Sequence, residues 1–517
     1  MTEKKKEKSP TVSRRDFLKY TSSAVAAAGV AAGGIVWSPG TAQAVGLPNK
    51  WDEEWDIVVI GSGFAGLSAA IEASVAGASV QVVEKMAVPG GNSTINGGDF
   101  AAAGSKIQKS AGIEDNPELM LKDMLKAGSY LNHVEKARLV AEQSNNALEW
   151  CIDYLGANFS GVGFHGGHSV KRAHHTSNGS GSEVVGKMLS KAKALGVNLQ
   201  MRAKLQRLVR NNEGRIVGVE IRKGYRFPDE NSGQPVFIKA KRAVILASGG
   251  FSQDVKLRQV HDPRLNTKFE STNQPGATGE ALLAACIAGA MDVHMDWIQL
   301  GPWTSPDERG FGHVPFFCER LVGYAPMINP QTGKRFFKET GNRKERADAI
   351  ILIGSPVVIF GDSETVTKRI HPPNALEGGI KTGSILKFQQ IEDVGAHFNM
   401  PLDAFVQEIA KWNTFVAQKK DPDFDCMIFP DAQPTLTPPF YAARLWPKVH
   451  HTMGGLLVDT QGRVTGFDLN PIQGLYAAGE ITGGVHGAVR LGGCAGTECI
   501  VLGRIAGRNA GTEKAWS

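Results

Sequence analysis

The sequence has few cysteines and no cysteine motif that would bind a metal or a haem. Six cysteines lie among 517 residues, at positions 151, 286, 318, 426, 494 and 499, and no two of them form a C-x-x-C pair. Such scattered spacing in a long chain is not that of a disulfide scaffold. The attachment motif of a c-type haem, C-x-x-C-H, is also absent. We therefore expect neither a metal site nor a covalent haem in this chain.

Long apolar runs and an excess of one charge are also missing. No run after residue 45 is long enough to span a membrane. The formal net charge of +6 falls to about +2 without the first 44 residues, which hold seven Lys/Arg and three Asp/Glu. No basic tract remains that would bind nucleic acid. With 42% apolar and 21% charged residues, the chain is typical of a globular protein of two or three domains.

The first 44 residues have the features of an export signal. The twin arginines of "SRRDFLK" (13–19) precede a short Gly/Ala-rich apolar stretch at 24–37, and "AQA" (42–44) offers a small-residue cleavage site. This order predicts a twin-arginine signal peptide, residues 1–44, and hence a periplasmic protein. A membrane anchor is the alternative, but the apolar stretch is short for one.

Glycine is in excess, with 61 residues, and one group of glycines forms a dinucleotide fingerprint. An apolar strand at 57–60 enters Gly61-x-Gly63-x-x-Gly66, and after a small-residue helix a second strand ends at Glu84. Gly61 makes the turn, Gly63 lets a pyrophosphate approach the backbone, and Gly66 packs the helix on the strand. The helix N-terminus favours the anion, and Glu84 stands where a carboxylate binds a ribose hydroxyl.

The remaining glycine-rich segments favour FAD over a nicotinamide. "PGGNSTINGGDFAAAG" (89–104) follows the fingerprint where a nicotinamide enzyme would begin another regular unit. Strands that end in small residues return at "KRAVILASGGF" (241–251) and "GLYAAGEITGG" (474–484). A fingerprint near the start with such strands in the middle and near the end is the layout of two-dinucleotide-binding flavoproteins.

This layout predicts an α/β fold with an interrupted FAD domain. The FAD domain would comprise residues 50–296 and 451–517 and would have a two-dinucleotide-binding, Rossmann-like architecture. Residues 297–450 carry most of the prolines and many aromatics, with little regular period. They predict an inserted α+β capping domain that closes over the flavin.

Five motifs resemble, in order, those of one enzyme family. The family comprises the flavoprotein subunits of fumarate reductases and succinate dehydrogenases, and the likeness is greatest to soluble periplasmic flavocytochrome-type fumarate and urocanate reductases. The resemblance covers roughly residues 50–515 and implies a FAD-dependent oxidoreductase acting on CH–CH groups, with FAD bound non-covalently. The motifs are "GGNS" (90–93), "TNQPGATGE" (272–280), "NPQTGKRFFKE" (329–339), "HHTMGGLLVD" (450–459) and "GGVHGAVRLGG" (483–493).

The resemblance also assigns roles to residues at matching positions. His450 and Arg490 match the pair that binds one substrate carboxylate, with Gly98 and Gly493 beside it. Arg343 matches the proton donor, and Glu319 stands in for the acid of the proton relay. Besides the fingerprint glycines, the FAD contacts would be Ala65, Glu84, Asn92, Ser93, Gly97, Gly98, Glu280, His451, Glu480 and Ala495.

These residue types suit the reduction of a C=C bond next to a carboxylate. Hydride addition needs an electron-poor double bond, so the carboxylate oxygens must be neutralised. Arg490 can bind them bidentately, and His450 can add a donor aimed at the developing charge. A guanidinium is essentially never deprotonated, so Arg343 either donates through a relay or acts only as an electrostatic clamp. Taken alone, a glycine-rich stretch with one arginine is more typical of a surface turn.

The match fails where the family binds a second carboxylate. Fumarate reductases keep a histidine before a proline there, whereas "IQLGP" (298–302) has Gly301. The threonine before the relay acid is replaced by Cys318 or Phe317, and the relay arginine is not clearly present. A second carboxylate would be desolvated and unpaired at such a site. Aromatic residues stand nearby in the sequence, at Trp297, Trp303, Phe311, Phe316 and Phe317.

We therefore expect a respiratory reductase of a 2-enoate with an apolar or aromatic substituent. The flavin N5 would deliver hydride to the β-carbon, and Arg343 would supply or relay a proton to the α-carbon. Because the chain has no haem motif, a separate c-type cytochrome would donate the electrons. Three alternatives stay open: fumarate reductase proper, a dehydrogenase working in reverse (including a 3-ketosteroid dehydrogenase), and a FAD-loaded binding protein without turnover. Arg490 argues against a steroid, since a neutral ketone needs no buried guanidinium.

Overall fold

The structure, a computed structural model, describes residues 47–370 and 373–516 of the chain. The predicted signal peptide, residues 1–44, lies outside this range. Within it, no helix is long and apolar enough to cross a membrane. All six cysteines are described and none is paired.

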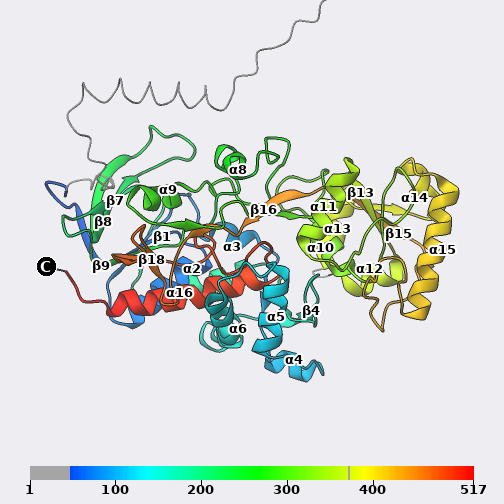
Figure 1. Cartoon of the computed structure of the whole chain (residues 1–517), viewed down its shortest axis with the longest axis horizontal. Coiled ribbons are helices and arrows are strands. Elements are labelled where there is room, and N and C mark those ends of the chain that lie inside the picture. The colour runs from blue at the N-terminus through cyan, green and yellow to red at the C-terminus, as the bar shows by residue number, and fades with distance from the viewer. Residues whose placement is uncertain (1–46, 371–372, 517) are drawn as a thin grey trace, which may run out of the picture. The chain divides into compact units, whose positions relative to one another are not determined.

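A sheet with a parallel centre joins the strands of both predicted dinucleotide motifs (Figure 1). Its central strand β1 (Glu53–Ile60) pairs in parallel with β2 (Val80–Val83) and with β9 (Gln234–Leu246). On the far side of β9 lies β19 (Pro471–Ala477), and β2 pairs with β6 (Asn198–Gln200), again in parallel. All residues of β2 and the last four of β1 are buried, which explains why the end of β1 is a continuous apolar run.

Antiparallel strands extend this sheet to eight. The hairpin of β7 (Ala203–Arg210) and β8 (Ile216–Lys223) joins it through the first half of β9, and β18 (Arg463–Thr465) pairs with β19. The sheet is therefore mixed, as in an α/β fold with an antiparallel extension.

The glycine-rich helix α16 packs tightly against the small-residue helix α2 in this part of the fold. The fingerprint helix α2 (Phe64–Val75) lies along α16 (Cys494–Thr512), the red helix of Figure 1. A Cβ at Gly503 would lie 2.5 Å from the carbonyl oxygen of Ala65, and one at Gly507 would lie 2.3 Å from that of Ala69. Glycines one turn apart thus let the two backbones approach, and the C-terminal helix supports the fingerprint.

The other elements of this part are short or peripheral. A three-stranded antiparallel sheet has the order β3-β5-β4, and β10 pairs with β17. The elements are α3 (Gly91–Ile95), β3 (Asp99–Ala101), α4 (Lys106–Ser110), α5 (Pro117–Ala127), α6 (Val134–Glu149), the π-helix η1 (Trp150–Tyr154), β4 (Phe159–Gly163), β5 (Ala173–Thr176), α7 (Ser182–Ala194), α8 (Val255–His261), α9 (Glu280–Ile287), β10 (Asp292–Val293) and β17 (Gly455–Leu456).

The elements from α10 to β15 gather around a sheet of their own, in the lime to yellow part of Figure 1. This sheet is antiparallel with the order β12-β13-β15-β14, and its two faces belong to separate apolar clusters. The elements are α10 (Val314–Leu321), β12 (Met327–Ile328), α11 (Arg343–Ile353), β13 (Val357–Asp362), α12 (Ser363–Arg369), α13 (Pro373–Thr382), β14 (Leu386–Phe388), α14 (Ile391–His397), α15 (Leu402–Gln418) and β15 (Phe440–Leu445).

The chain passes between the two groups of elements at one antiparallel ladder. It pairs β11 (Ile298–Gly301) with β16 (Lys448–Thr452). The proposed borders of the cap, residues 297 and 450, therefore lie side by side. The α/β class is confirmed by this architecture, and the division into domains at these borders stays a prediction.

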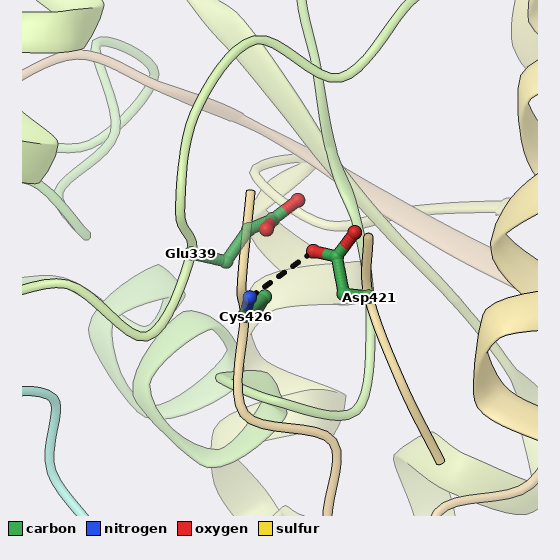
Figure 2. Close-up of side chains that lie close together, drawn as sticks. All are labelled: Glu339, Asp421 and Cys426. Atoms are coloured by element: carbon green, nitrogen blue, oxygen red, sulfur yellow. Dashed lines mark hydrogen bonds between the residues drawn. The ribbon is translucent and has the colours of Figure 1, made fainter. Parts of the chain in front are cut away.

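A buried ion cluster ties two loops of the second group together. Figure 2 shows Glu339 and Asp421 close to Cys426, whose backbone N–H donates to Asp421. Arg335 donates to Glu339 through Nε at 2.7 Å and to Asp421 through Nη2 at 2.7 Å, and its guanidinium lies over the Trp412 ring. The guanidinium pairs with both carboxylates, one positive charge against two negative ones, so the cluster is a buried network of ion pairs.

Candidate active site

Two cavities open at the carboxyl ends of the central strands and join. The first is lined by Ile60 at the end of β1, by the fingerprint, and by Ala247 after β9. The second is lined by residues from both groups of elements. The residues that line both are Phe64, Asn92, Ser93, Glu480 and Cys499. The cavities thus form one channel at the position where open α/β sheets bind their ligands.

The fingerprint glycines build the floor of the first cavity. Gly61 has a φ of +107°, and a Cβ there would lie 2.4 Å from the Ala247 carbonyl oxygen. At Gly66 a Cβ would lie 2.0 Å from the Gly61 oxygen, so this residue packs helix on turn and does not face the cavity. Gly63 faces the cavity and precedes α2 without a side-chain cap. The helix N-terminus is therefore open to a pyrophosphate.

Acidic residues lie at the far end of this cavity. Glu84 is buried and accepts hydrogen bonds from the Ser62 backbone N–H at 3.1 Å and from that of Met86 at 2.8 Å. Glu280 pairs with Lys85 at 3.0 Å. Both carboxylates line the first cavity, and their contact with FAD stays a prediction.

The junction of the two cavities is polar. Ser93 Oγ accepts from the Phe64 N–H at 2.9 Å, and Asn92 Oδ1 accepts from the Gln274 N–H at 2.8 Å. Glu480 accepts from the Thr452 N–H at 3.0 Å, and burial raises its pKa to about 7. These side chains are fixed by backbone donors of distant segments.

The second cavity collects most of the remaining predicted residues. Gly98 is the exception: a Cβ there would lie 2.0 Å from Thr176 Oγ1, so the glycine serves packing, and it lines neither cavity. Its contact with FAD or substrate stays a prediction without support from the cavities. Ala65 lines the first cavity. The predicted residues that line the second are Gly97, Glu319, Arg343, His450, His451, Arg490, Gly493 and Ala495.

Arg490 presents an unsatisfied donor in this cavity. Its side chain is buried, its Nη1 donates to the Leu491 carbonyl at 2.9 Å, and its Nε has no partner among the described residues. Burial, reinforced by the nearby positive charge of Arg343, lowers the pKa of Arg490 to about 9. A buried guanidinium with a free N–H is costly unless an anion binds it. The site is therefore suited to a carboxylate.

His450 is held beside Arg490 as a neutral ring. Its Nδ1 lies 2.8 Å from Thr272 Oγ1, and its ring meets the edge of Trp303 at 4.6 Å between centroids. Burial, followed by the charges of Arg490 and Arg343, holds its pKa well below the usual value. The Thr272 hydroxyl can either donate to Nδ1 or accept from it; in the tautomer in which it donates, the hydrogen resides on Nε2, which is then the ring's donor.

Arg343 begins helix α11 and lies within reach of Glu319. Its Nη2 is 3.7 Å from the Glu319 carboxylate, and its Nη1 has no partner among the described residues. Glu319, from α10, also accepts from Arg346 Nη2 at 2.6 Å. Burial would raise the pKa of Glu319, but Arg346 and a hydrogen bond from His165 outweigh it and lower the pKa. Glu319 is therefore a carboxylate between two arginines of one helix.

The Trp303 indole lies against Gly301, the position where fumarate reductases keep the histidine that binds a second carboxylate. A Cβ at Gly301 would lie 3.0 to 3.2 Å from three atoms of the Trp303 ring. Of the five aromatics of this region, Trp303, Phe311 and Phe316 line the second cavity. Phe317 is fully buried in the core of the second group, and Trp297 does not line the cavity.

Comparison with known proteins identifies the family. Residues 56–495 match the family described as FAD binding domain. The chain is 39% identical over 511 residues to the acrylate reductase flavoprotein subunit of Shewanella woodyi, covering 96% of this chain and 97% of that protein. It is 36% identical over 464 residues to the fumarate reductase (cytochrome) of Shewanella frigidimarina, covering 88% and 76%.

The chain belongs to the fumarate reductase family of FAD-binding flavoproteins. The solved open conformation of a flavocytochrome c3 fumarate reductase matches with a TM-score of 0.71 and 31% identity, covering 98% of this chain and 82% of that one. Residues 4–38 match the family described as Ubiquitinol-cytochrome C reductase Fe-S subunit TAT signal. The flavoprotein is thus a FAD-dependent oxidoreductase acting on CH–CH groups, and its twin-arginine export signal is confirmed.

The channel of the flavoprotein fits FAD. Gly61 and Gly63 leave room for a pyrophosphate at the N-terminus of α2, and Glu84 lies at the far end of the first cavity. The junction residues Asn92 and Glu480 would then flank the flavin ring, which would extend into the second cavity toward Arg490.

Some residues of the site escaped the sequence analysis of this flavoprotein. Arg346 of α11 pairs with Glu319 at 2.6 Å, whereas Arg320 of α10 pairs with Asp99 at 3.3 Å. The signal for Arg346 is its position three residues after Arg343, on the same helix face. Thr272, which orients His450, lies inside a recognised motif but was given no role.

Proposed function

We propose that this flavoprotein reduces the C=C bond of a 2-enoate that carries a single carboxylate. The observation that carries the proposal is the unpartnered, buried Nε of Arg490 beside a neutral His450. These two residues provide donors for one carboxylate. The position that would bind a second one is Gly301, packed against the Trp303 indole.

The residues of the second cavity divide the work of the reaction. FAD, when bound, supplies a hydride for the β-carbon of the enoate. Arg490 neutralises the carboxylate, and His450 donates to the charge that develops on it during the reaction. Arg343 holds a proton for the α-carbon, and Glu319 returns a proton to Arg343 after each turnover. The aromatic wall of Trp303 and Phe311 excludes water from this region.

The substituent on the β-carbon is proposed to be apolar or absent. A carboxylate there would face the six-membered ring of the Trp303 indole, which carries no donor, and would cost several kcal/mol. The likeness to an acrylate reductase flavoprotein subunit, with near-complete coverage of both chains, supports a substrate of this class.

The proposed compartment rests on the export signal, and the proposed electron donor rests on the lack of a haem motif in this chain. Export by the twin-arginine route supports a periplasmic enzyme in anaerobic respiration. The chain has no C-x-x-C-H motif, which supports a separate c-type cytochrome as donor. Fractionation of cells, followed by reduction of the flavin with purified periplasmic cytochromes, tests both statements.

The substrate class is tested with FAD-loaded protein and reduced methyl viologen. Acrylate, methacrylate, cinnamate, urocanate and fumarate are compared by kcat/KM. We expect one or more monocarboxylates to exceed fumarate clearly. Fumarate as the best substrate would refute the proposal, and oxidation of the saturated acids without reduction of any enoate would indicate the reverse reaction.

Arg490→Gln tests the carboxylate clamp directly. The neutral amide keeps most of the volume but loses the charge, so kcat/KM for every enoate should fall about 100-fold or more. Flavin content, read from the absorbance of the purified variant, should remain that of wild type. Unchanged turnover in flavin-replete Arg490→Gln would contradict the role of Arg490.

A further inference from the structure

Three successive carbonyl groups at Arg490 accept hydrogen bonds from buried side chains. Gln299 Nε2 donates to the carbonyl oxygen of Arg490 at 2.8 Å, and Arg490 Nη1 donates to that of Leu491 at 2.9 Å. His168 Nε2 lies 2.9 Å from the carbonyl oxygen of Gly492. Because the arginine side chain folds back onto its own segment, the orientation of these peptide groups sets where the guanidinium lies.

The hydrogen bonds at both ring nitrogens of His168 require one tautomer. A guanidinium has only donors, so Arg172 Nη1, which is 2.9 Å away, donates to His168 Nδ1. A carbonyl oxygen only accepts, so His168 Nε2 carries the hydrogen and donates to Gly492. Burial, followed by the charge of Arg172, holds the pKa of His168 well below its usual value. The ring is therefore neutral, and its N–H is directed at Gly492.

Arg172, just before strand β5, is itself held by two carboxylates. Its Nε and Nη2 donate to Asp115 at 2.8 and 2.7 Å, and its Nη1 also donates to Asp123 at 2.6 Å. The Arg172 side chain and the His168 ring are both buried. A guanidinium paired in this way cannot turn without leaving a buried charge unpaired, so Arg172 fixes the tautomer of the histidine.

The loop that carries His168 also packs closely against Leu491 and Gly492. A Cβ at Gly492 would lie 2.6 Å from the Cβ atom of His165, and a Cβ at Gly167 would lie 2.7 Å from Leu491 Cδ2. Glycines on both sides of the contact therefore let the loop reach this segment. His168 lines neither cavity, so it would act on a ligand only through the segment that it contacts.

We propose that His168 is a positioning residue for the carboxylate clamp, because it holds the Gly492 peptide so that the Arg490 guanidinium faces the substrate. This inference rests on the proposed function, in which Arg490 binds the carboxylate of a 2-enoate. His168 does not touch the substrate, and no proton or electron passes through it. A displacement of a binding group by about 1 Å is enough to lower catalysis by up to about 100-fold. The histidine thus contributes to turnover through geometry.

The test compares His168→Leu with a conservative variant and a matched control. Leucine occupies the space of the ring but has no N–H, so the Gly492 carbonyl loses its donor. In His168→Gln, the side-chain amide provides a new N–H for Gly492, and its oxygen can accept from Arg172. The control is His174→Leu, since His174 is also buried and bonds a backbone carbonyl, that of Phe100 at 3.2 Å, and lines neither cavity.

With FAD-loaded protein, we expect His168→Leu to lower kcat/KM for acrylate about 10-fold, mainly through a higher KM. The binding of propionate, measured by calorimetry, should weaken by a similar factor. His168→Gln should regain most of the lost kcat/KM. His174→Leu should keep the KM of wild type, even where both leucine variants lose the same stability in urea unfolding. A KM of wild-type size in His168→Leu, or the same rise of KM in His174→Leu, would overturn the inference.

A readout without turnover comes from NMR of FAD-loaded protein with isotope-labelled histidine or arginine. In the wild type, His168 should be the Nε2–H tautomer near neutral pH, with its signal assigned by its loss in His168→Gln. The Nε–H signal of Arg490, assigned by its loss in Arg490→Gln, should move in His168→Leu and stay in place in His174→Leu.

The NMR signals also separate this inference from the proposed function. An Nδ1–H tautomer or an imidazolium at His168 in the wild type would overturn the inference even if His168→Leu does not fold. An Arg490 signal that stays in place in His168→Leu would overturn it as well. If the wild type reduces no enoate and binds no propionate, the proposed function fails, and the two signals still decide whether His168 positions Arg490.

Discussion

Single residues in the second cavity carry more buried positive than negative charge. Arg320, Arg343 and Arg490 line it, against the carboxylates of Asp99 and Glu319, and the third acid, Glu480, has its pKa raised to about 7 by burial. Arg346 pairs with Glu319 without lining the cavity. Unpaired donors remain on Arg343 and Arg490 among the described residues. An excess of this kind is unfavourable in the free protein and is relieved by an anionic ligand. The buried arginines of this flavoprotein thus favour the binding of a carboxylate.

At the same scale, we expect Trp303 to lower the affinity of the site for dicarboxylates. Gly301→His alone should fail to bind fumarate, because the new side chain collides with the indole. Gly301→His combined with Trp303→Ala provides the space, and kcat/KM for fumarate should rise about 10-fold relative to Trp303→Ala. The measurement is viologen oxidation with fumarate and acrylate for the two single variants and the double variant. An equal effect of Gly301→His with and without Trp303 would contradict this role.

At the scale of elements, the contact of α2 with α16 sets the geometry of the cofactor channel. Gly507→Val places a side chain 2.3 Å from the Ala69 carbonyl and should reduce the free energy of unfolding by about 1–3 kcal/mol. Gly186→Ala on α7 is the control, since a Cβ there meets no atom within 4 Å and the helix gains about 0.4–1 kcal/mol. Urea unfolding of both variants checks this, and equal stabilities would contradict the tight contact.

The ion pairs of Arg335 with Glu339 and Asp421 also act between elements, because they join the loop before α11 to the loop after α15. Arg335→Met leaves Glu339 and Asp421 buried without a cation and should cost about 3–5 kcal/mol near neutral pH. Burial raises the pKa of Asp421, but Arg335 outweighs it and lowers the pKa. The ion pair therefore stabilises the native state fully above the unfolded carboxyl pKa of about 4 and loses this contribution as the pH falls.

The difference in unfolding free energy between wild type and Arg335→Met should accordingly shrink below about pH 4. Lys368→Met provides the control, because its ion pair with Glu364 is exposed and is worth less than about 1 kcal/mol. A difference that stays constant with pH, or one as small as that of Lys368→Met, would contradict the buried ion pair.

At the scale of the whole molecule, the channel gathers segments from both ends of the chain, from Gly61 to Cys499. FAD should therefore stabilise the fold globally. At about 100 times its Kd it should add about 2.7 kcal/mol to the free energy of unfolding. Thermal unfolding with and without FAD measures this. FMN should give a much smaller shift, because it lacks the half that the first cavity would hold; equal shifts would contradict the assignment of that cavity.

The sequence by itself determined the features that depend on local physics. Gly61 and Gly66 must be glycine because their backbones touch neighbouring segments, and such a requirement is visible in the spacing alone. Arg490 and His450 were predicted because each stands in a recognised motif, and Arg343 because it follows the motif at 329–339 closely; all three line the second cavity.

Only the tertiary structure decided which distant segments meet. Arg346 faces Glu319 across 27 residues, and His165 bridges Glu319 and Asp99 across 154 and 66. The indole of Trp303 over Gly301 and the tight packing of Gly98 likewise depend on three-dimensional contact. No local pattern encodes such pairs, because the free energy of a buried charge or ring depends on neighbours that the fold, and not the adjacent sequence, brings to it.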